Sequence, residues 1–311
     1  MAAQTPVLER PNRPGGRRRP PASGRDRADR RLGYLLVAPA VILLLAVTAY
    51  PLAYNLWNSF HAENLSIATG QGGFVGLHNY KEMFESSEWV SALLRTLAFA
   101  GISVAIETVL ALGLALMLHR QFRGRALLRV AVLIPWAVPT VVSATLWKTM
   151  FDPRAGFVDY IFGLHTTWLA GVWTSWAAIF VADAWKNVPF IAIILLAGLQ
   201  VIPTEIYEAA RIDGATWGQS FRRLTMPLLK PALAVALVFR LLSALLIFDV
   251  IYIMTGGGPG LSTETLSFLN WQTFLVNTDF GYGGAISVVL VLMCIAFAGI
   301  VMRVMRTKVV T

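Results

Sequence analysis

Long apolar stretches alternate with shorter polar connections along most of the chain. A helix needs about 20 predominantly apolar residues to cross the hydrocarbon core of a membrane. Six stretches reach about that length, near residues 32–57, 90–118, 127–150, 176–201, 232–254 and 285–302. The pattern therefore predicts an all-α integral membrane protein, with a bundle of six helices over residues 32–311.

One polar connection, residues 203–231, has the features of folded structure. Glu205 and Glu208 suit the positively charged first turn of a helix, and Gly214 stands where a left-handed residue would end it. A second short helix is expected over residues 217–224. The segment predicts two helices joined at a glycine, an elbow that docks on another surface.

Residues 1–31 are rich in proline, glycine and arginine and almost free of apolar side chains. Such a composition predicts a disordered tail. A cleaved signal peptide is the rival interpretation, but the apolar stretch that follows is too long and is not closed by a small-x-small cleavage site. We expect a basic cytoplasmic tail that orients the first helix and touches anionic lipid.

The charges in the connections predict how the helices are oriented. The 119–129 connection contains four arginines and no acidic residue, and residues 303–308 contain three basic residues. The 59–89 connection instead contains four glutamates and one lysine. Because basic residues are retained on the cytoplasmic side, this pattern predicts that both termini, the 119–129 connection and the elbow lie in the cytoplasm.

Composition excludes several other classes of protein. Hydrophobic residues make up 56% of the chain and charged residues 14%, with a mean hydropathy of +0.62, whereas soluble domains carry about 25% charged residues. The net charge of +9 does not indicate nucleic-acid binding, because the basic residues gather in the tail and beside the apolar stretches. A single cysteine, Cys294, rules out an intrachain disulfide.

The sequence contains no catalytic or nucleotide-binding motif. It lacks the phosphate-loop, zinc-protease and nucleophile-elbow patterns, and its four histidines are scattered. The glycine cluster at 256–260 is not followed by Lys-Ser/Thr, so we expect no phosphate loop there. We therefore expect a non-enzymatic chain with no catalytic residue, metal or cofactor of its own. Any ATP must be bound by another chain.

Five ionisable residues fall inside the apolar stretches: Glu107, Asp183, Lys186, Arg240 and Asp249. Each costs about 2.5–3.5 kcal/mol at the centre of a membrane helix, so each needs a partner or a cavity. Asp183 and Lys186 are three residues apart, which allows a mutual ion pair. A second interpretation, compatible with the first, is a pathway lined by both, in which neighbouring aromatic rings suit the apolar faces of a sugar. We expect Glu107 to form a structural hydrogen bond with a neighbouring helix.

The fifth stretch carries a second polar group. Asp249 lies near Ser243 and Tyr252 in the sequence. It either lines the same pathway or pairs with Arg240 or Lys186. We expect Arg240 to have a structural role, paired with Asp249 or with a backbone carbonyl.

The elbow carries a sequence motif. Residues 208–215 read Glu-Ala-Ala-Arg-Ile-Asp-Gly-Ala, and a hydrophobic-x-x-Pro stretch follows at 224–227. This motif resembles the coupling loop of the permease subunits of binding-protein-dependent ATP-binding-cassette importers. The Gly-Gly-Gly-Pro cluster after Phe248-Asp249 is similar to their carbohydrate-uptake branch. The resemblance implies a six-helix permease of the type I importer class, in which residues 203–231 dock on an ATPase subunit.

The resemblance also implies which residues contact the substrate and the partner. An x-Trp-x-x-x-Pro pattern before the elbow matches the family's substrate site and points to Asp183, Lys186, Asn187 and Phe190. The expected substrate contacts are Asp183, Trp185, Lys186, Asn187, Phe190, Ser243, Asp249 and Tyr252. The expected ATPase contacts are Glu208, Ala209, Ala210, Asp213, Gly214 and Ala215.

Members of this family work as assemblies, so the resemblance implies partners. They are a second permease subunit in a heterodimer, two copies of a cytoplasmic ATPase that bind ATP and Mg²⁺, and an extracytoplasmic sugar-binding protein. The resemblance also implies a multi-pass protein of a bacterial inner membrane, in contact with lipid and not with nucleic acid. The large outer domain of some maltose-type permeases is not expected here.

The resemblance favours a sugar, such as the disaccharides trehalose or maltose, as the substrate. Asp183 and Lys186 stand where the maltose-type protein has uncharged groups, which leaves the choice of sugar open. A glycerophospho compound is an alternative, although it would require more positive charge than Lys186 offers. An ion-gradient-driven secondary transporter or channel would instead predict inverted repeats and broken helices with paired acids, and the sequence shows no such repeat.

Overall fold

The computed structural model describes residues 24–65, 72–154, 156–163 and 166–305. Most of the predicted basic tail therefore lies outside the described residues. The first helix, α1 (Gly24–Asn58), begins inside the range for which the sequence predicted disorder. The chain divides into two compact units, residues 1–53 and 54–311.

The first unit contains most of α1, a helix of 35 residues. From Leu32 to Asn58 this helix is long and apolar enough to cross a membrane. It contains Pro39 and Pro51, which membrane helices tolerate better than soluble ones. Its length and composition are those of a membrane-spanning helix.

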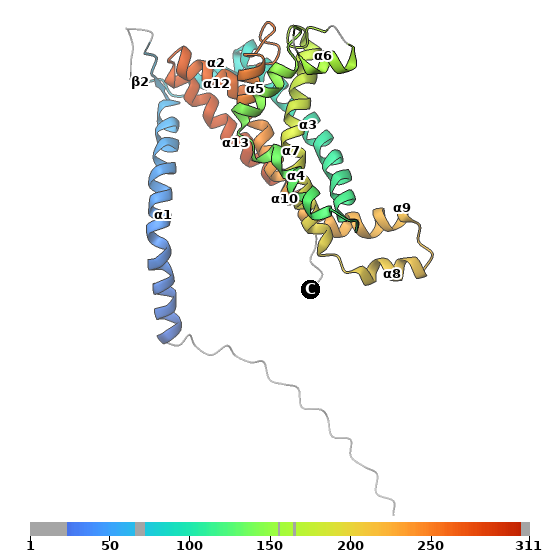
Figure 1. Ribbon diagram of the computed structural model, residues 1–311. Helices are drawn as coiled ribbons and strands as arrows, with labels where there is room; N and C mark the ends of the chain where they lie inside the picture. Colours follow the sequence, from blue (N-terminus) through green and yellow to red (C-terminus); the bar gives the residue numbers. More distant parts are fainter. Residues whose placement is uncertain (1–23, 66–71, 155, 164–165, 306–311) are drawn as a thin grey trace, which may run out of the picture. The chain divides into compact units, whose positions relative to one another are not determined.

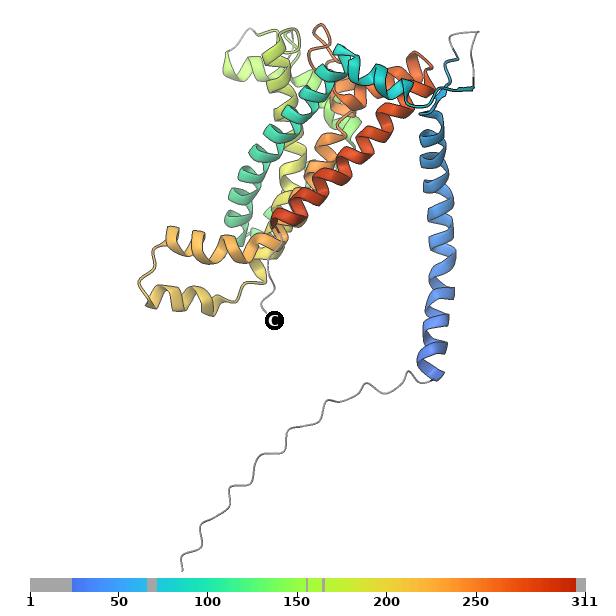
Figure 2. The same cartoon turned by 180° about the vertical axis from the view of Figure 1, so that it is seen from behind.

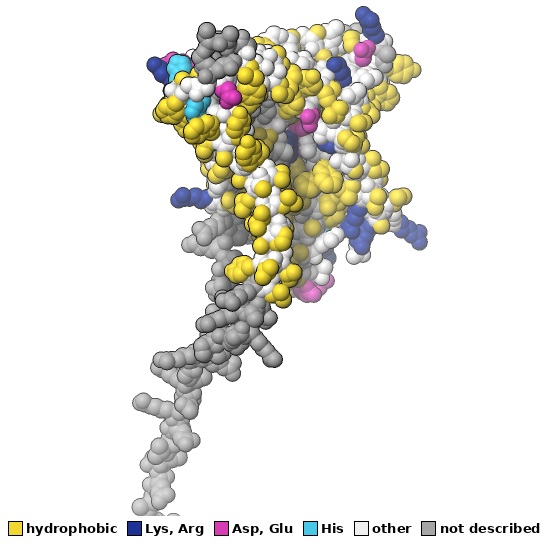
Figure 3. Space-filling model, turned by 90° about the vertical axis from the view of Figure 1, so that its left-hand side faces the viewer, with side chains coloured by type: hydrophobic (Ala, Val, Ile, Leu, Met, Phe, Trp, Pro, Cys, Tyr) yellow, Lys and Arg dark blue, Asp and Glu magenta, His cyan; other side chains and the backbone are white. Residues whose placement is uncertain are grey.

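Four long helices form the framework of the second unit (Figures 1 and 2): α3 (Ser87–His119), α7 (Val172–Gln200), α10 (Met226–Leu245) and α13 (Phe280–Met305). α7 packs along α3, and α10 contacts α3, α7 and α13. Small residues permit this close approach, because a Cβ atom on Gly198 of α7 would lie 2.5 Å from the Cβ atom of Ala232. Most of the coloured side chains visible in Figure 3 are hydrophobic, which suits contact with lipid.

Two of the predicted membrane helices are broken. The stretch predicted at 127–150 consists of α4 (Arg125–Ala137) and α5 (Thr140–Met150), which are bent by 91° at the break. Pro139 explains this break, because proline lacks an N–H group and disfavours helical backbone at the residue before it. The stretch predicted at 232–254 consists of α10 and the short α11 (Asp249–Met254), which are separated at residues 246–248. The prediction of continuous helices was wrong at both places.

Short elements gather at one end of the second unit (Figure 1). They are α2 (His78–Glu85), α6 (Phe157–Phe162), α12 (Leu266–Trp271) with the π-helical turn Gln272–Val276, and the antiparallel strands β1 (His61–Ala62) and β2 (Gly73–Phe74). Gly281 allows α13 to approach this group closely, because a Cβ atom there would lie 2.3 Å from the carbonyl oxygen of His61.

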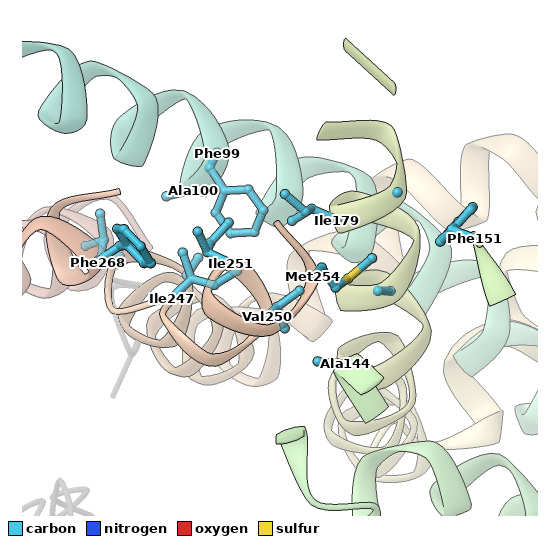
Figure 4. Packing of buried hydrophobic residues seen from close by; sticks show 14 residues of the cluster. Phe99, Ala100, Ala144, Phe151, Ile179, Ile247, Val250, Ile251, Met254 and Phe268 are labelled. Atoms are coloured by element: carbon cyan, nitrogen blue, oxygen red, sulfur yellow. The ribbon is translucent and has the colours of Figure 1, made fainter. Parts of the chain in front are cut away.

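A core of apolar side chains holds α11 against the long helices (Figure 4). Phe99 of α3 and Ile179 of α7 belong to the same buried cluster as Ile251 and Met254 of α11. Between membrane helices such packing stabilises through van der Waals contacts, because lipid tails are as apolar as these side chains. The cluster therefore fixes the position of α11 after the break in the fifth membrane helix.

The elbow extends from the other end of the second unit (Figures 1 and 2). It consists of α8 (Thr204–Ile212) and α9 (Trp217–Ser220), with Gly214 in the turn between them. The sequence predicted a separate second helix, but α9 continues through the π-helical turn Phe221–Thr225 into α10. One helix thus runs from Trp217 to Leu245, and it joins the elbow directly to the membrane-spanning part.

Candidate functional site

Arg240 of α10 lies at the centre of a buried hydrogen-bond network, called here the Arg240 network. Its guanidinium donates to both oxygens of Glu107 on α3, at 2.9 Å for Nη2 to Oε1, and to Oδ2 of Asp183 on α7. It also donates to Ser103 Oγ and, at 3.1 Å, to Ser243 Oγ. Glu107, Asp183 and Arg240 are 1%, 5% and 4% exposed. The network joins three of the four long helices.

Further hydrogen bonds satisfy the two carboxylates of the Arg240 network. Ser103 Oγ lies 3.1 Å from Glu107 Oε1 and 3.0 Å from Asp183 Oδ2. Asn187 donates from Nδ2 to Asp183 Oδ1 at 2.8 Å. A buried ion pair is stable only when such additional hydrogen bonds complete its environment. The Arg240 network is therefore suited to hold α3, α7 and α10 together.

These contacts correct two predictions and confirm a third. Asp183 pairs with Arg240, so the predicted ion pair between Asp183 and Lys186 was wrong. Arg240 pairs with Glu107 and Asp183, so its predicted pairing with Asp249 or with a carbonyl was also wrong. The structural hydrogen bond predicted for Glu107 is confirmed. Spacing along one helix could not reveal these partners, because they come from three helices.

Lys186 contacts the break between α4 and α5. Its ammonium donates to the carbonyl oxygen of Val138, the residue that follows α4, and lies 3.4 Å from the carbonyl oxygen of Trp136. Phe190, one turn further along α7, stacks on the ring of Trp136 with a centroid distance of 5.0 Å and an interplanar angle of 9°. α7 thus contacts the break through both a cation and an aromatic ring.

The second break, between α10 and α11, has different contacts. The carbonyl oxygen of Ile247 accepts a hydrogen bond of 3.1 Å from the hydroxyl of Thr265. Asp249 is exposed in the first turn of α11, where a negative charge is favourable. Tyr252 stacks on Phe248 with a centroid distance of 5.4 Å. Because α11 packs against α5, the segments that follow the two breaks lie together.

Trp185 lies beside an apolar cavity of about 630 Å³. The walls of this cavity come from α5, α6, α7 and the segment between α6 and α7. Trp147 and Trp168 also line it, and the rings of Trp147 and Trp185 meet edge to face at 5.9 Å. The cavity offers aromatic surface and almost no polar group.

The structure therefore distributes the eight predicted substrate residues over several places. They are Asp183, Asn187 and Ser243 in the Arg240 network, Lys186 and Phe190 at the first break, Asp249 and Tyr252 after the second break, and Trp185 at the apolar cavity. Sequence reasoning missed Ser103 and Trp136. The substrate role of the eight residues stays a prediction.

Hydrogen bonds between neighbours in the sequence determine the shape of the elbow. Gly214 has a φ of +74°, which confirms the predicted left-handed cap. The Ala215 N–H donates to Ala210 O at 2.9 Å and the Gly214 N–H to Arg211 O at 3.0 Å, the two bonds of a Schellman motif. Thr216 and Gln219 then form a capping box that starts α9. The turn between α8 and α9 is thus specified at both ends.

Most of the residues predicted to contact an ATPase are accessible. Glu208, Ala209, Asp213 and Gly214 are exposed, and Ala215 is half-buried. Ala210, in contrast, is buried, so its methyl group packs inside the elbow. A hollow of about 490 Å³ lies between the elbow and the end of α3, and it is lined in part by Arg120 and Trp217. These contacts stay a prediction.

At the opposite end of the second unit, Glu264 is fully buried in the loop between α11 and α12. Its Oε2 lies 3.6 Å from Nη1 of Arg95 on α3, and no described residue donates a hydrogen bond to either carboxylate oxygen. Burial, with a smaller effect of Glu88, raises the pKa of Glu264 from its ordinary value of 4.5 to about 7, although Arg95 lowers it. The carboxyl group of Glu264 is therefore close to titration at neutral pH. Glu264 and Arg95 are called here the outer pair.

The described residues contain no group of three or more His, Cys, Asp or Glu side chains that could hold a metal ion. Three of the buried carboxylates face arginines instead: Glu107 and Asp183 face Arg240, and Glu264 faces Arg95. Cys294 on α13 is a half-buried free thiol. The arrangement of charged groups in this part of the chain thus favours structural pairing over metal binding.

Comparison with known proteins identifies the family. Residues 107–310 match the family described as the binding-protein-dependent transport system inner membrane component. The chain is 39% identical over 282 residues to the trehalose/maltose transport system permease protein MalF of Thermococcus litoralis, a match that covers 89% of this chain and 95% of that protein. It is 40% identical over 274 residues to the trehalose transport system permease protein SugA of Mycobacterium tuberculosis, covering 88% of each. The chain belongs to this family and is a transport subunit of the ATP-binding-cassette importer class.

A solved structure shows the same fold. The similar chain belongs to a bacterial ABC transporter involved in the import of the acidic polysaccharide alginate; the TM-score is 0.79 at 22% identity, over 92% of this chain and 99% of that chain. Identity this low supports the fold alone. The predicted all-α permease fold is confirmed. Membership of this family excludes the alternative of a secondary transporter. The broken helices expected for a secondary transporter are nevertheless present.

Proposed function

We propose that this chain forms, together with a second permease subunit, the pathway by which a sugar enters the cell. The sugar is a disaccharide such as trehalose or maltose, and an extracytoplasmic binding protein delivers it. The similarity to two permeases named for trehalose or maltose, over most of their length, carries this proposal. The stacked rings of Trp136 and Phe190 beside polar groups also suit the apolar faces and hydroxyl edges of a sugar.

A glycerophospho compound is the second candidate substrate. The chain is 33% identical over 283 residues to the sn-glycerol-3-phosphate transport system permease protein UgpA of Agrobacterium fabrum. A phosphate group would require an available cation. Arg240 is engaged by two carboxylates, and the Lys186 ammonium is engaged by backbone carbonyl groups. These contacts favour an uncharged sugar over a phosphate.

In this proposal the energy for transport comes from other chains. Two copies of a cytoplasmic ATPase bind ATP and Mg²⁺, while this chain has no catalytic role. The elbow docks on one ATPase, so the elbow and both termini lie in the cytoplasm. The end with α2, α6 and α12 then faces the binding protein, outside a bacterial inner membrane. The basic 119–129 connection supports this orientation.

The connections of the elbow suit it to transmit a movement. The elbow follows α7 directly, and it continues into α10 as a single helix. Arg240 ties α7 and α10 to α3. A displacement of the elbow by the ATPase would therefore move three long helices as one body, the type of rigid-body movement by which transporters alternate access.

The substitution Gly214→Asp tests this coupling. An aspartate at a φ of +74° strains the backbone by about 1–2 kcal/mol and places a charge at the proposed ATPase contact. We expect uptake of labelled trehalose or maltose, and sugar-stimulated ATP hydrolysis, to fall to background in the reconstituted complex. The complex should still assemble, because no atom beyond the two adjacent residues lies within 4 Å of the position of the new Cβ atom.

Gly124→Asp is the matched control for this experiment. Gly124 lies in the 119–129 connection, on the same side as the elbow in this proposal, with a φ of +86° and equally open surroundings. We expect this variant to keep its uptake and ATP hydrolysis. Normal coupling in Gly214→Asp, or equal losses in both variants, would contradict the proposed role of the elbow. Uptake of labelled glycerol 3-phosphate in place of sugar would favour the second candidate substrate.

A further inference from the structure

The end of α4 leaves carbonyl groups without helical partners. In any α-helix the last four carbonyl groups have no intrahelical N–H partner. Pro139 worsens this loss, because it follows α4 closely and has no N–H group to offer. In the hydrocarbon region such groups must be satisfied from within the protein. The break between α4 and α5 therefore needs a donor from another element.

Lys186 supplies this donor. Its ammonium donates to Val138 O and lies 3.4 Å from Trp136 O. The C-terminal end of a helix carries a partial negative charge, so a cation is the most favourable donor at this position. The carbonyl groups of broken helices in some transporters coordinate free cations. In this protein the ammonium group of Lys186, a side chain of α7, takes the place of a free cation.

The break has a second contact with the same face of α7. Trp136, whose carbonyl oxygen faces Lys186, also stacks its ring on Phe190 at 5.0 Å. Lys186 and Phe190 are four residues apart, and residues at this spacing share one face of a helix. Phe239 of α10 then meets the ring of Phe190 edge to face at 6.3 Å. A movement of α7 relative to α4 would have to disturb both contacts together.

We propose that Lys186 is a positioning residue, which fixes the bend between α4 and α5 through backbone carbonyl groups and does not bind the sugar. α5 packs against α7 and α11, so the bend determines where α5 lies relative to α11. α7 leads into the elbow, so Lys186 also passes a movement of α7 to α5. The role in transport rests on the proposed function, whereas the role in the bend does not.

Transport kinetics separate positioning from sugar binding. In the reconstituted complex we expect Lys186→Met to lower the maximal uptake rate about tenfold, the loss expected for a hydrogen bond to a charged group. The concentration of sugar-loaded binding protein at half-maximal rate should not change. Lys186→Arg keeps a long cationic donor and should recover most of the rate. Lys148→Met on α5 is the matched control, because Lys148 is exposed, and it should leave both parameters unchanged.

Distance measurements test the bend itself, in a chain whose native cysteine is replaced by alanine. Spin labels at Val130 on α4 and Val142 on α5, both exposed, report the angle between the two helices. We expect a narrow distance distribution in the parent chain and the arginine variant, and a broader or shifted one in the methionine variant. Labels at Leu94 and Val109, both exposed on the unbroken α3, should give the same distribution in every variant.

Two results would overturn the inference. The first is an unchanged distance distribution in Lys186→Met. The second is a raised half-saturating concentration with altered sugar selectivity, which would assign Lys186 to the substrate. Failure of the parent complex to take up any sugar would instead contradict the proposed function, and the distance measurement would still test the bend.

Discussion

Arg240 and Arg95 both face buried carboxylates, but their surroundings differ. In the Arg240 network each carboxylate accepts hydrogen bonds from the guanidinium, and Ser103 or Asn187 supplies further ones. In the outer pair the contact between Arg95 and Glu264 is 3.6 Å long, and the described residues donate no hydrogen bond to that carboxylate. The Arg240 network lies within the long helices, whereas Glu264 lies in a loop.

The difference follows from what each location permits. Within the hydrocarbon region charged groups are stable only if other protein groups satisfy them fully. Near the end of the helices a carboxyl group can instead bind a proton, because burial disfavours its charged form. The raised pKa of Glu264, about 7, agrees with this explanation. We therefore expect the Arg240 network to be a fixed tie and the outer pair to respond to pH.

Arg240→Met should have the largest effect, because it leaves Glu107 and Asp183 buried without their cation. Removal of one partner from a buried ion pair costs about 3–5 kcal/mol. We expect a large fall in the apparent melting temperature of the purified complex and in its yield. Lys81→Met is the control, because Lys81 pairs with Glu85 at 3.9 Å on the surface and an exposed pair of this kind contributes little.

Neutralising all three charged groups sharpens this test. A variant that combines Arg240→Met with Glu107→Gln and Asp183→Asn lacks both the cation and the charges that it balances. It should be more stable than Arg240→Met alone, because an uncharged amide is less costly to bury than a carboxylate. If Arg240→Met were as stable as the parent, the network would not be the tie between α3, α7 and α10.

Glu264→Gln tests the outer pair, with an intermediate effect. The pKa of Glu264 is about 7 in the folded protein, above its ordinary value of 4.5, so the folded state binds the proton more tightly than the unfolded state. The stability gained in this way is present at low pH and is lost as the pH rises through the folded-state pKa. Between about pH 5 and about pH 8 we expect the parent complex to lose on the order of 3 kcal/mol, seen as a falling apparent melting temperature.

The glutamine variant should lack this part of the pH dependence and should be more stable than the parent above neutral pH. Glu85→Gln is the matched control, because Glu85 is exposed on α2 at the same end of the second unit. It should keep the pH profile of the parent. Coinciding profiles for the parent and Glu264→Gln would mean that Glu264 does not titrate in this range.

The elbow and the Arg240 network also differ in how well the sequence predicted them. The cap at Gly214 depends on hydrogen bonds between close neighbours, such as Ala215 N–H to Ala210 O, so a local pattern was sufficient. The partners of Arg240 lie 57 and 133 residues away, at Asp183 and Glu107. The three-residue spacing of Asp183 and Lys186 suggested a pair within α7. This spacing contains no information on which face of α7 packs against α3 or α10.

The two helix breaks show the same limit. Pro139 is a local cause of the first break, and its position in the sequence could have indicated that break. Residues 246–248 are Leu, Ile and Phe, none of which stops a helix as proline or glycine does. Packing of α11 in the core and the bond from Thr265 to Ile247 O hold this second break. Both are contacts with other parts of the fold, which apolar periodicity does not reveal.

Ser103→Ala should give the smallest effect. It distinguishes the contribution of the Ser103 hydroxyl to stability from that of the Arg240 guanidinium. Both carboxylates keep Arg240 after this change, so we expect a loss of about 1–2 kcal/mol, measured as a small fall in apparent melting temperature. Ser175→Ala is the control, because Ser175 is equally buried but its hydroxyl makes a longer contact, 3.4 Å to Trp168 O. A fall as large as that of Arg240→Met would mean that the Ser103 hydroxyl, more than charge balance, holds the three helices together.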